Sequence, residues 1–341
     1  MTFPWVEAPY DPRAPLSGAH RCDIAVVGGG IAGTAAAALL ARRGANVALV
    51  ERDAVGGGAT AANPGIVGAP SPYPYAIAAH LLGRPTARVL WSLARRHREL
   101  LRELGADVVQ RGGLERGRDL AESARLLRDD GFPVEARDDG LFFPDHLELD
   151  PVRLARHLAA TAEESGARVF ERTPAALERV DPPRVRGPHG ELAAEMVLVC
   201  ADADTPALAG FFDGVVFAAR ARAWVTGPLV ERLLPVPVTL SGGRAAARQL
   251  DDGRIVGFGS PDALVGRVPI AREGSATLAL CCDELPNVGP VPGTVRVHAI
   301  AGFHGRGLSL ALAAAEISAS MMLDGRAPEV AAAFSPRRHA L

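Results

Sequence analysis

The sequence predicts an α/β fold in two parts: a parallel sheet flanked by helices, and a second α+β domain with a mixed sheet. Three observations predict it. Residues 23–52 read as strand, glycine-rich turn, helix and strand in direct succession. Further apolar, strand-like segments occur at 167–170 and 196–200, after a helix-like segment. Residues 215–286 alternate short apolar stretches with turns, which is typical of a largely antiparallel sheet.

The stretch 23–52 organises the rest of the chain. Asp23 to Val27 predicts a short buried strand, and Ile31 to Arg43 is an alanine-rich run without a breaker, which predicts a helix. Val47 to Val50 predicts a second strand, and Glu51 follows it directly. A strand, a helix and a second strand in this order predict a βαβ unit with parallel strands.

Glycines follow the first strand in the spacing G-x-G-x-x-G, at Gly28, Gly30 and Gly33. The first permits a tight turn, the second lets the backbone approach a pyrophosphate, and the third lets the helix pack closely on the strand. The free N–H groups at the helix start face the phosphate charge, and Glu51 lies where a carboxylate accepts ribose hydroxyls. The pattern predicts dinucleotide binding; the alternative is a glycine-rich turn in some other βαβ unit.

Composition is that of an ordinary globular chain. The 341 residues carry a net charge of −2 and are 48% apolar, which is enough for two domains and a large core. Neither sign of charge is strong enough to indicate nucleic acid or a membrane surface, and we expect no membrane span. Residues 1–19 lack the basic start and apolar core of a signal peptide. We therefore expect a proline-rich surface arm and a cytoplasmic location.

The cysteines are Cys22, Cys200, Cys281 and Cys282, and they form neither C-x-x-C nor a zinc spacing. Cys22 and Cys200 lie in or beside apolar strands, where a thiol is a small core group. The adjacent pair, Cys281 and Cys282, leaves two interpretations open. It is a redox or covalent-flavin site, or it is two strand residues that face opposite sides; the second is favoured.

A second glycine-rich stretch, residues 56–70, follows the second predicted strand and contains Gly58, Ala59, Thr60, Asn63 and Gly65. Such a stretch can run an extended backbone beside a ligand. Together with the first motif it resembles the D-amino-acid-oxidase-like family of FAD-dependent oxidoreductases, which includes glycine oxidase and sarcosine oxidase. The resemblance implies a Rossmann-like FAD-binding domain, with this stretch beside the ribityl chain and flavin.

The remaining elements are predicted in order. Residues 72–103 predict one long helix that carries a basic run at 95–98; a solvated face is favoured for this run over a phosphate-polymer contact. Asp150 predicts an N-cap, with Pro151 in the first turn of a helix that ends at Gly166. Further strands are expected at 167–170, 196–200, 223–226, 244–250, 254–258 and 295–301, with a turn at 252–253 and a helix from Leu308 onward.

The closing stretch resembles the family's C-terminal signature, with D-x-x-P at Asp283 and the glycines Gly302, Gly305 and Gly307 after a strand. The resemblance implies that this loop and helix start face the flavin, where the helix dipole stabilises charge on the reduced ring. The family usually has a glycine where this chain has Asp202, and a carboxylate there is repelled by a pyrophosphate unless its side chain turns away.

The resemblance, which covers about residues 20–325, divides the chain into a discontinuous FAD-binding domain (20–78, 150–212 and 287–330) and a substrate domain (79–149 and 213–286). The FAD-binding residues that it implies are Gly28, Gly30, Ile31, Ala32, Gly33, Glu51, Arg52, Gly58, Ala59, Thr60, Asn63, Gly65, Ile66, Ala175, Ala201, Gly302, Gly305, Arg306, Gly307 and Leu308. A non-covalent flavin is expected, because neither adjacent cysteine lies where covalent relatives place their thiol.

The family's chemistry implies oxidation of a C–N bond in a small amine or amino acid, with hydride transfer to flavin N5 and reoxidation by oxygen or another acceptor. The family's carboxylate-binding arginine is absent, since Leu278 stands five residues before Asp283. His304 and Arg306, in the flavin-facing loop, are the expected catalytic-site replacements. Arg248 and Arg272 are weaker candidates and are expected at the surface.

Two other functions stay open. One is a tRNA wobble-uridine-modifying FAD oxidoreductase, because a flavin domain of this family has a similar x-R-G-L loop, here Arg306-Gly307-Leu308. That function needs a basic face. The other is a degenerate, non-catalytic FAD-binding protein, which the missing arginine favours. The substrate, the electron acceptor and the oligomeric state do not follow from the sequence.

Overall fold

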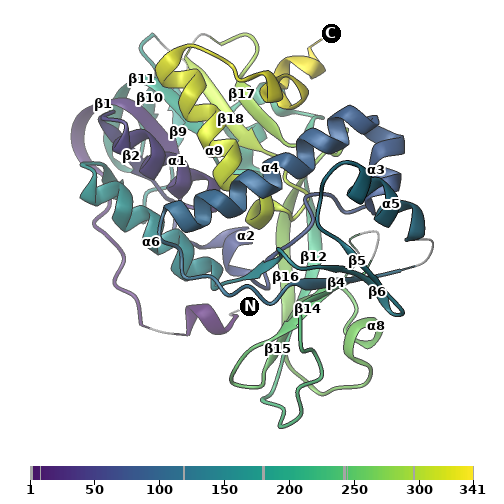
Figure 1. Cartoon of the computed structure of the whole chain (residues 1–341). Helices are drawn as coiled ribbons and strands as arrows, with labels where there is room; N and C mark the ends of the chain where they lie inside the picture. Colours follow the sequence, from purple (N-terminus) through teal and green to yellow (C-terminus); the bar gives the residue numbers. More distant parts are fainter. Residues whose placement is uncertain are drawn as a thin grey trace.

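The computed structural model describes residues 3–7, 9–117, 120–178, 181–240, 243, 245–294 and 296–340. Their strands form two eight-stranded sheets and a two-stranded ribbon of β3 (Ile66–Val67) and β7 (Leu147–Glu148). In Figure 1 the first sheet and its helices form the upper body, and the second sheet lies below them. The chain passes between the two sheets several times, so each domain is assembled from separated segments.

The first sheet has the order β17-β18-β11-β1-β2-β8, with β10 and β9 added beyond β11. Its central strand, β1, is parallel to both β11 and β2. Strand β8 is parallel to β2, and β18 is parallel to β11. Strand β17 is antiparallel to β18, and the hairpin β9–β10 is antiparallel to β11. The strand bounds are β1 Ser17–Val27, β2 Val47–Val50, β8 Arg168–Phe170, β9 Ala176–Glu178, β10 Arg184–Arg186, β11 His189–Val199, β17 Asn287–Pro290 and β18 Val297–Ala301.

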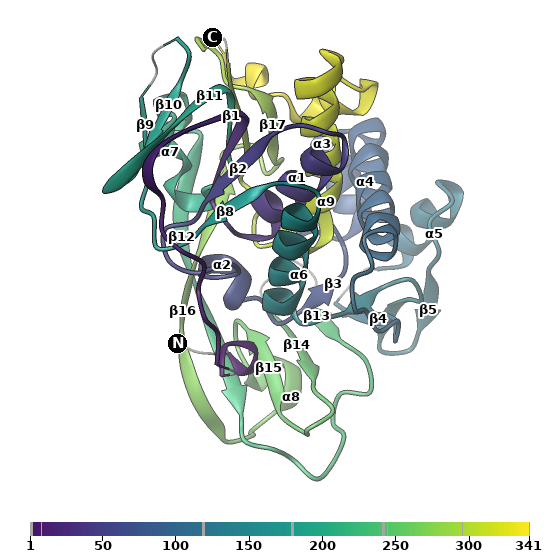
Figure 2. The same cartoon turned by 90° about the vertical axis from the view of Figure 1, so that its left-hand side faces the viewer.

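Four helices cover one face of this sheet and lie side by side in Figure 2: α1 (Ile31–Arg42), α6 (Pro151–Glu164), α9 (Gly307–Asp324) and α4 (Arg84–Glu103). The alanines of α1 from Ala35 onward are buried between sheet and helices, and small side chains allow this close packing. As the sequence predicts, Asp150 caps α6, since its Oδ1 accepts hydrogen bonds of 2.9 Å from the N–H groups of Val152 and Arg153.

The second sheet has the order β16-β12-β15-β14-β13-β4-β6-β5. It is mixed, because β4 and β13 run parallel while the other neighbours run antiparallel. Its strands are β4 Gly113–Arg116, β5 Glu135–Arg137, β6 Gly140–Phe143, β12 Val216–Thr226, β13 Val238–Leu240, β14 Ala246–Gln249, β15 Ile255–Phe258 and β16 Ile270–Cys281. The short helices are α2 Gly58–Ala61, α3 Tyr75–Leu82, α5 Ala121–Asp129, α7 Thr205–Leu208 and α8 Asp262–Val265.

Several elements differ from the sequence predictions. The long helix expected over 72–103 is two helices, α3 and α4, because Gly83 between them has φ +80°. Strand β1 begins at Ser17, six residues before the predicted start. The long strand β16 begins at Ile270, whereas the sequence analysis expects a strand only around Cys281 and Cys282. The predicted strand ends at Arg244 and Val295 lie outside the described residues.

The N-terminal segment also differs from the predicted surface arm. Phe3 and Leu16 are each 1% exposed, and Trp5 stacks on Phe3 with ring centroids 5.6 Å apart. The indole Nε1 of Trp5 donates a hydrogen bond of 3.0 Å to the Ala61 carbonyl. Aromatic rings bury large apolar areas, and these two hold the segment against α2.

Helix α9 is long and apolar enough, by length and composition, to cross a membrane. It lies against α1 and α4 in the interior, and 67% of its apolar window is buried. This burial explains its composition, since a helix that is apolar all round is covered on all sides by its neighbours.

Candidate functional site

One large cavity, of about 1010 Å³, lies between the two sheets and collects most of the predicted cofactor-binding residues. The predicted residues that line it are Gly28, Gly30, Ile31, Ala32, Glu51, Arg52, Gly58, Ala59, Thr60, Asn63, Ala175, Ala201, Gly305, Gly307 and Leu308. His304 lines it too. Within the described part of the chain, Gly33, Gly65, Ile66, Gly302 and Arg306 do not line it.

The glycines of the first motif have separate physical tasks. A Cβ on Gly28, which has φ +112°, would lie 2.3 Å from the Cys200 carbonyl oxygen. A Cβ on Gly33 would lie 1.9 Å from the Gly28 carbonyl oxygen, so Gly33 packs the helix on the strand behind the cavity wall. Beside Gly30 such an atom would meet only the Thr60 hydroxyl, at 3.3 Å. The backbone at Gly30 is therefore open for the close approach of a phosphate group.

Glu51 stands at the end of β2, where the motif predicts a ribose acceptor. Its Oε2 accepts a 2.6 Å hydrogen bond from the N–H of Gly29, and its Oε1 accepts one of 2.9 Å from the N–H of Asp53. Burial raises the pKa of this carboxyl, and the two backbone donors oppose that rise. Each oxygen keeps a second lone pair for a ligand hydroxyl.

The second glycine-rich stretch forms the wall of the cavity next to the first motif. The Thr60 hydroxyl accepts a 3.3 Å hydrogen bond from the N–H of Ile31, which joins α2 to the start of α1. Asn63 Oδ1 accepts one of 2.9 Å from the N–H of Gly65. Gly65 has φ +81°, and a Cβ there would lie 2.1 Å from the Leu149 carbonyl oxygen. Gly65 thus shapes the stretch from behind.

The loop between β18 and α9 closes the other end of the cavity. His304 has φ +52°, and its N–H donates a 3.0 Å hydrogen bond to the Ala279 carbonyl. Its Nε2 accepts a 2.9 Å hydrogen bond from the N–H of Cys281. Burial lowers the pKa of this imidazole, and the accepting Nε2 leaves the ring proton on Nδ1. The ring is therefore fixed by the loop and β16 while it also lines the cavity.

Arg306 lies elsewhere than the sequence analysis expects. Its side chain lines a second, small pocket together with Glu115 and His146, outside the large cavity. Burial lowers the pKa of Arg306, and burial raises that of Glu115 to about 7 although the guanidinium opposes the rise. Among the described residues, Arg306 side-chain atoms have no hydrogen-bond or ion-pair partner within the usual distances. A Cβ on Gly243, which lines the large cavity, would lie 2.7 Å from Arg306 Nη2, so the guanidinium stands at the boundary between the two pockets.

The strand pair β12 and β16 of the second sheet forms one wall of the large cavity. Ala219 stands opposite Leu278, and Ala221 stands opposite Ala276. Cross-strand partners share a face of a sheet, so this face is apolar. It adjoins the flavin loop, because a Cβ on Gly305 would lie 3.3 Å from Leu278 Cδ1.

The intervening residues of the two strands point to the opposite face. They include Arg220, which is paired in register with Thr277, and Arg222, which makes an ion pair with Glu273. Both arginines line the large cavity and are exposed. The sequence analysis does not predict this wall, because it assigns no strand to most of β16. The alternation of side chains along that strand separates the two faces.

Arg248 and Arg272, the weaker candidates for a substrate-binding arginine, both make contacts within the protein. The prediction that Arg248 lies at the surface is wrong, since it is 8% exposed. Its guanidinium donates to the carbonyls of Pro64 (2.6 Å) and Leu149 (2.7 Å) and to Glu148 (3.0 Å), and these acceptors compensate for its burial. Arg272 is at the surface as predicted, with a 39% exposed side chain in an ion pair with Glu7.

Asp202 lines the large cavity in the place where the family usually has glycine. It adopts φ +48°, a conformation that glycine takes without strain. Burial raises the pKa of its carboxyl to about 6, although the backbone of Ala279 and Ala203 donates to it. The carboxyl is turned toward β16, which is one of the two outcomes that the sequence allows.

The basic run of α4 offers no cationic face. Arg96 makes ion pairs of 2.6 Å with both Glu103 and Glu316, and Arg98 pairs with Asp145. His97 is fully buried and Arg98 is 7% exposed, so the prediction of a solvated face is wrong for these two residues. Their partners neutralise the positive charge that a phosphate polymer would need.

Comparison with known proteins agrees with this architecture. A model of the family described as "FAD dependent oxidoreductase" matches residues 23–269. The glycine oxidase of Geobacillus kaustophilus is 28% identical over 187 residues, which are 45% of this chain and 47% of that protein. The chain thus matches about half the length of this curated relative.

Solved structures match over nearly the whole chain. The crystal structure of glycine oxidase from Geobacillus kaustophilus superposes with a TM-score of 0.78 at 22% identity, covering 94% of this chain and 100% of that one. L-proline dehydrogenase from P. horikoshii gives 0.77 at 19% identity, over 95% and 98%. L-amino acid deaminase from Proteus vulgaris, lacking its specific insertion, gives 0.76 at 18% identity, over 98% of both chains. At these identities the likeness shows a shared fold.

Proposed function

This chain belongs to the family of FAD-dependent oxidoreductases, and from that membership we propose that it oxidises a C–N bond of a small amine or amino acid. FAD is the cofactor of the family, and when bound it supplies the hydride acceptor, N5 of its ring. The protein's part in such a reaction is to bind the cofactor, hold the amine carbon against the ring and keep water away.

The residues fit FAD. The large cavity runs from Glu51 to His304, so one elongated ligand can contact both the β2 end and the loop before α9. The open backbone at Gly30 suits the pyrophosphate, and Glu51 suits the ribose of the adenosine half. The N-terminus of α9 faces the other end, where its N–H groups favour negative charge. Asp202 is the residue that fits least well, and its turned carboxyl lessens the repulsion.

The wall next to the flavin loop supports a substrate with an apolar substituent. Ala221, Ala276 and Leu278 present methyl and methylene groups where the family's carboxylate-binding arginine would lie. A carboxylate buried without a partner is strongly disfavoured. Within this substrate class we therefore favour a plain amine over an α-amino acid. His304 is a polar group at the loop end of the cavity, whereas Arg220 and Arg222 belong to the other face of the strand pair.

A single observation carries this proposal: the FAD-binding segments and an apolar face of the second sheet line the same cavity. The test is anaerobic bleaching of the flavin absorbance by matched amine pairs. Isobutylamine and valine differ only by the carboxylate, as do benzylamine and phenylglycine. We expect the amine of each pair to bleach the flavin at lower concentration than the amino acid.

Other outcomes separate the alternatives. Stronger bleaching by the amino acids would contradict the apolar-wall argument and leave C–N oxidation intact. If no amine bleaches the flavin of a protein that holds FAD, the proposed activity is overturned and a non-catalytic FAD-binding protein is favoured. Retention of tRNA by the holoprotein would favour the tRNA-modifying function, which the ion-paired basic run of α4 does not support.

The electron acceptor that reoxidises the flavin is also part of this proposal. We propose oxygen or another small acceptor, and a cytoplasmic location. The same bleached samples distinguish oxygen from other acceptors: admission of air restores the yellow colour of an oxidase within one turnover, whereas a dehydrogenase needs a quinone or dye.

A further inference from the structure

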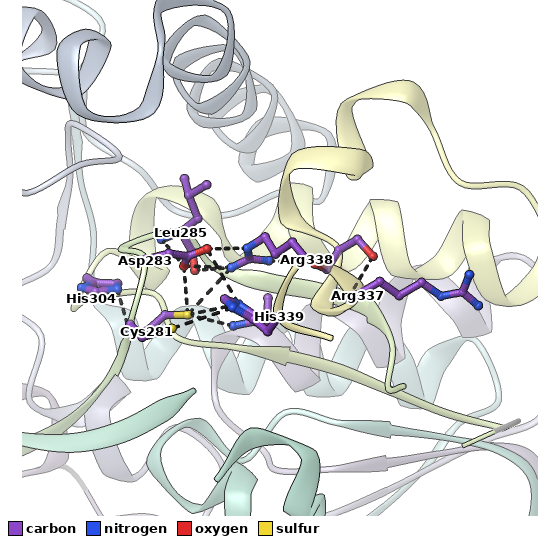
Figure 3. Close-up of polar contacts among 10 residues, drawn as sticks. Cys281, Asp283, Leu285, His304, Arg337, Arg338 and His339 are labelled. Atoms are coloured by element: carbon purple, nitrogen blue, oxygen red, sulfur yellow. Dashed lines mark hydrogen bonds and ion pairs between the residues drawn. The ribbon is translucent and has the colours of Figure 1, made fainter. Parts of the chain in front are cut away.

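A cluster of four side chains lies outside the large cavity, where the end of β16 meets the C-terminal segment. We name it the thiol cluster: Cys281, Cys282, Asp283 and His339. The first three residues are consecutive, and His339 arrives from a 3-10 turn over Pro336–His339. Figure 3 shows the carboxylate of Asp283, the sulfur of Cys281 and the ring of His339 converging, with the guanidinium of Arg338 beside them.

The donor atoms of these four residues lie within 4.8 Å of one another. Cys281 Sγ is 3.1 Å from Asp283 Oδ1 and 3.7 Å from His339 Nε2. Cys282 Sγ is 3.8 Å from His339 Nδ1, and Asp283 Oδ2 is 3.8 Å from His339 Nε2. In a tetrahedral zinc site the ligand atoms stand about 3.3–3.8 Å apart, which follows from bond lengths of ~2.0–2.3 Å. Only one nitrogen of His339 can bind the metal, so with one donor atom from each residue the cluster spans at most 4.8 Å, which is about 1 Å wider than a closed zinc site.

The sequence prediction for the cysteine pair is corrected by this geometry. Two adjacent strand residues would point to opposite faces, but β16 ends at Cys281 and the chain turns at Cys282. Both sulfur atoms then approach one imidazole, although Cys281 is 2% exposed and Cys282 is exposed. The C-C-D run forms one half of the cluster, which no sequence spacing rule predicts.

The surroundings of the thiol cluster orient its donors. Arg338 donates through Nε (2.6 Å) and Nη2 (3.1 Å) to the two oxygens of Asp283, and Asn287 Nδ2 lies 3.2 Å from Cys281 Sγ. These contacts hold the carboxylate of Asp283 and the sulfur of Cys281 toward the ring of His339.

We propose that the thiol cluster is a structural zinc site, formed by the two cysteine sulfurs, one oxygen of Asp283 and one nitrogen of His339. Two thiolates, an imidazole and a carboxylate suit Zn²⁺ at tetrahedral geometry better than Mg²⁺ or Ca²⁺, which prefer oxygen ligands. Four protein ligands complete the coordination, as in structural rather than catalytic zinc sites.

The binding step is balanced in charge and protons. Zn²⁺ forms two zinc–sulfur bonds as two S–H bonds break, and two protons pass to solvent. The hydrogen bond from Cys281 Sγ to Asp283 is replaced by coordination of both groups. Two thiolates and a carboxylate leave the site one negative charge beyond the metal, and the guanidinium of Arg338 balances it. Such partners orient ligating groups from outside the coordination sphere.

The site has a purpose in the fold. It ties the C-terminal segment to the end of β16, whose residues Leu278 and Leu280 line the large cavity. It also fixes the N–H of Cys281, which donates to His304 in the flavin loop. Bound zinc would therefore hold this wall of the cavity without contacting the flavin.

The first experiment measures metal in the holoprotein purified without chelator and then dialysed. We expect about one zinc per chain, released when the thiols are modified by a mercurial. Replacement by Co²⁺ alone should give the thiolate-to-cobalt charge-transfer absorption of a tetrahedral sulfur site, read in apoprotein so that flavin does not interfere. A chain that binds neither metal with reduced thiols would overturn the proposal, as would a disulfide between Cys281 and Cys282 in the protein as isolated.

The variants are chosen to fold. Cys282→Ser and His339→Gln change one accessible thiol and one residue of the C-terminal segment, and each should lower zinc affinity by at least about a hundredfold. Arg338→Ala should lower it by about ten- to a hundredfold, as an outer partner does. Cys22→Ser, outside the cluster, and Arg337→Ala, beside it, are matched controls and should bind zinc as wild type does. Equal zinc content in Cys282→Ser, His339→Gln and the controls would show that the metal lies elsewhere.

Discussion

Asp202 is a carboxylate that lines the cavity in which we propose that FAD binds, and it is held at a positive φ that glycine would adopt freely. Its pKa, which burial raises to about 6, separates two regimes. Below that pH the side chain is neutral and tolerates the anionic cofactor. Above it the carboxylate is charged, and the binding of FAD must overcome repulsion or drive the uptake of a proton.

We predict that the affinity for FAD falls as the pH rises through about 6. Each pKa unit that the bound pyrophosphate adds to Asp202 costs about tenfold in affinity at alkaline pH. Asp202→Asn, which is neutral and tolerates a positive φ, should bind FAD about tenfold more tightly than wild type at pH about 8 and equally at pH about 5. Titration of apoprotein with FAD by flavin fluorescence measures both. An unchanged pH profile in the variant would place the repulsion elsewhere.

Leu278 is the second residue at which a substitution should increase a binding preference, here the preference for an amino acid over the matched amine. Leu278→Arg places a guanidinium on the apolar face, beside the flavin loop. A charge-assisted hydrogen bond contributes about 1.5–3 kcal/mol, so valine should gain about ten- to a hundredfold over isobutylamine in kcat/KM or bleaching affinity. Ser275→Arg, on the opposite face of the same strand and outside the lining of the large cavity, is the matched control. If both variants shift the preference equally, charge alone is responsible and the placement of the wall is wrong.

At the scale of elements, a carboxyl on β4 and a guanidinium just before α9 face the same small pocket. Glu115 on β4 and Arg306 before α9 share a small pocket with His146, behind the flavin loop. Burial raises the pKa of Glu115 from 4.5 to about 7 against the attraction of Arg306. A carboxyl with a raised pKa stabilises the fold fully below its unfolded pKa, and this stabilisation is lost as the pH rises through the folded pKa.

We therefore predict that the FAD-saturated protein loses stability between pH 4.5 and about 7, by on the order of 1–3 kcal/mol. Glu115→Gln removes this titration while keeping the shape of the side chain. Its urea midpoint should change less between pH about 5 and about 8 than that of wild type, with Asp202 contributing equally to both proteins. A parallel pH dependence in the two would show that Glu115 is ionised throughout.

Local sequence rules predict the elements that depend on local physics. The βαβ unit and the Asp150 cap follow from apolar periodicity and from the chemistry of helix caps, and the structure confirms them. The structure also brings most of the residues that the resemblance implies for FAD to one cavity. Strand β16 and its apolar face depend on pairing with β12, whose register no local pattern gives. The burial of Arg248 could not be predicted for a similar reason, because its acceptors come from Pro64 and Leu149, which are distant in sequence. The glycine motif predicts the loop that carries Arg306, but a motif fixes the backbone and leaves the side-chain direction open.

At the scale of the whole molecule, both domains must be in place to complete the cavity, and we predict that FAD is held there without a covalent bond. Among the described residues that line the large cavity the cysteine is Cys200, at the adenosine end, while Cys281 and Cys282 lie outside it. Acid precipitation should release all the yellow colour into the supernatant. Glu51→Arg, which inverts the charge at the ribose, should lose most of the FAD, whereas Arg248→Lys should not. Colour that stays in the acid pellet would contradict the non-covalent bond.

The interleaving of the two domains has a consequence for how the chain emerges from the ribosome. Helix α1 packs against α9, and β11 pairs with β18, so the first sheet keeps an uncovered apolar face until residues beyond 301 have been synthesised. Domains generally fold as units during translation, yet here the first unit to be started is the last to be finished. The nascent chain must be protected from aggregation while it waits, and truncation before α9 should yield inclusion bodies rather than a smaller folded domain.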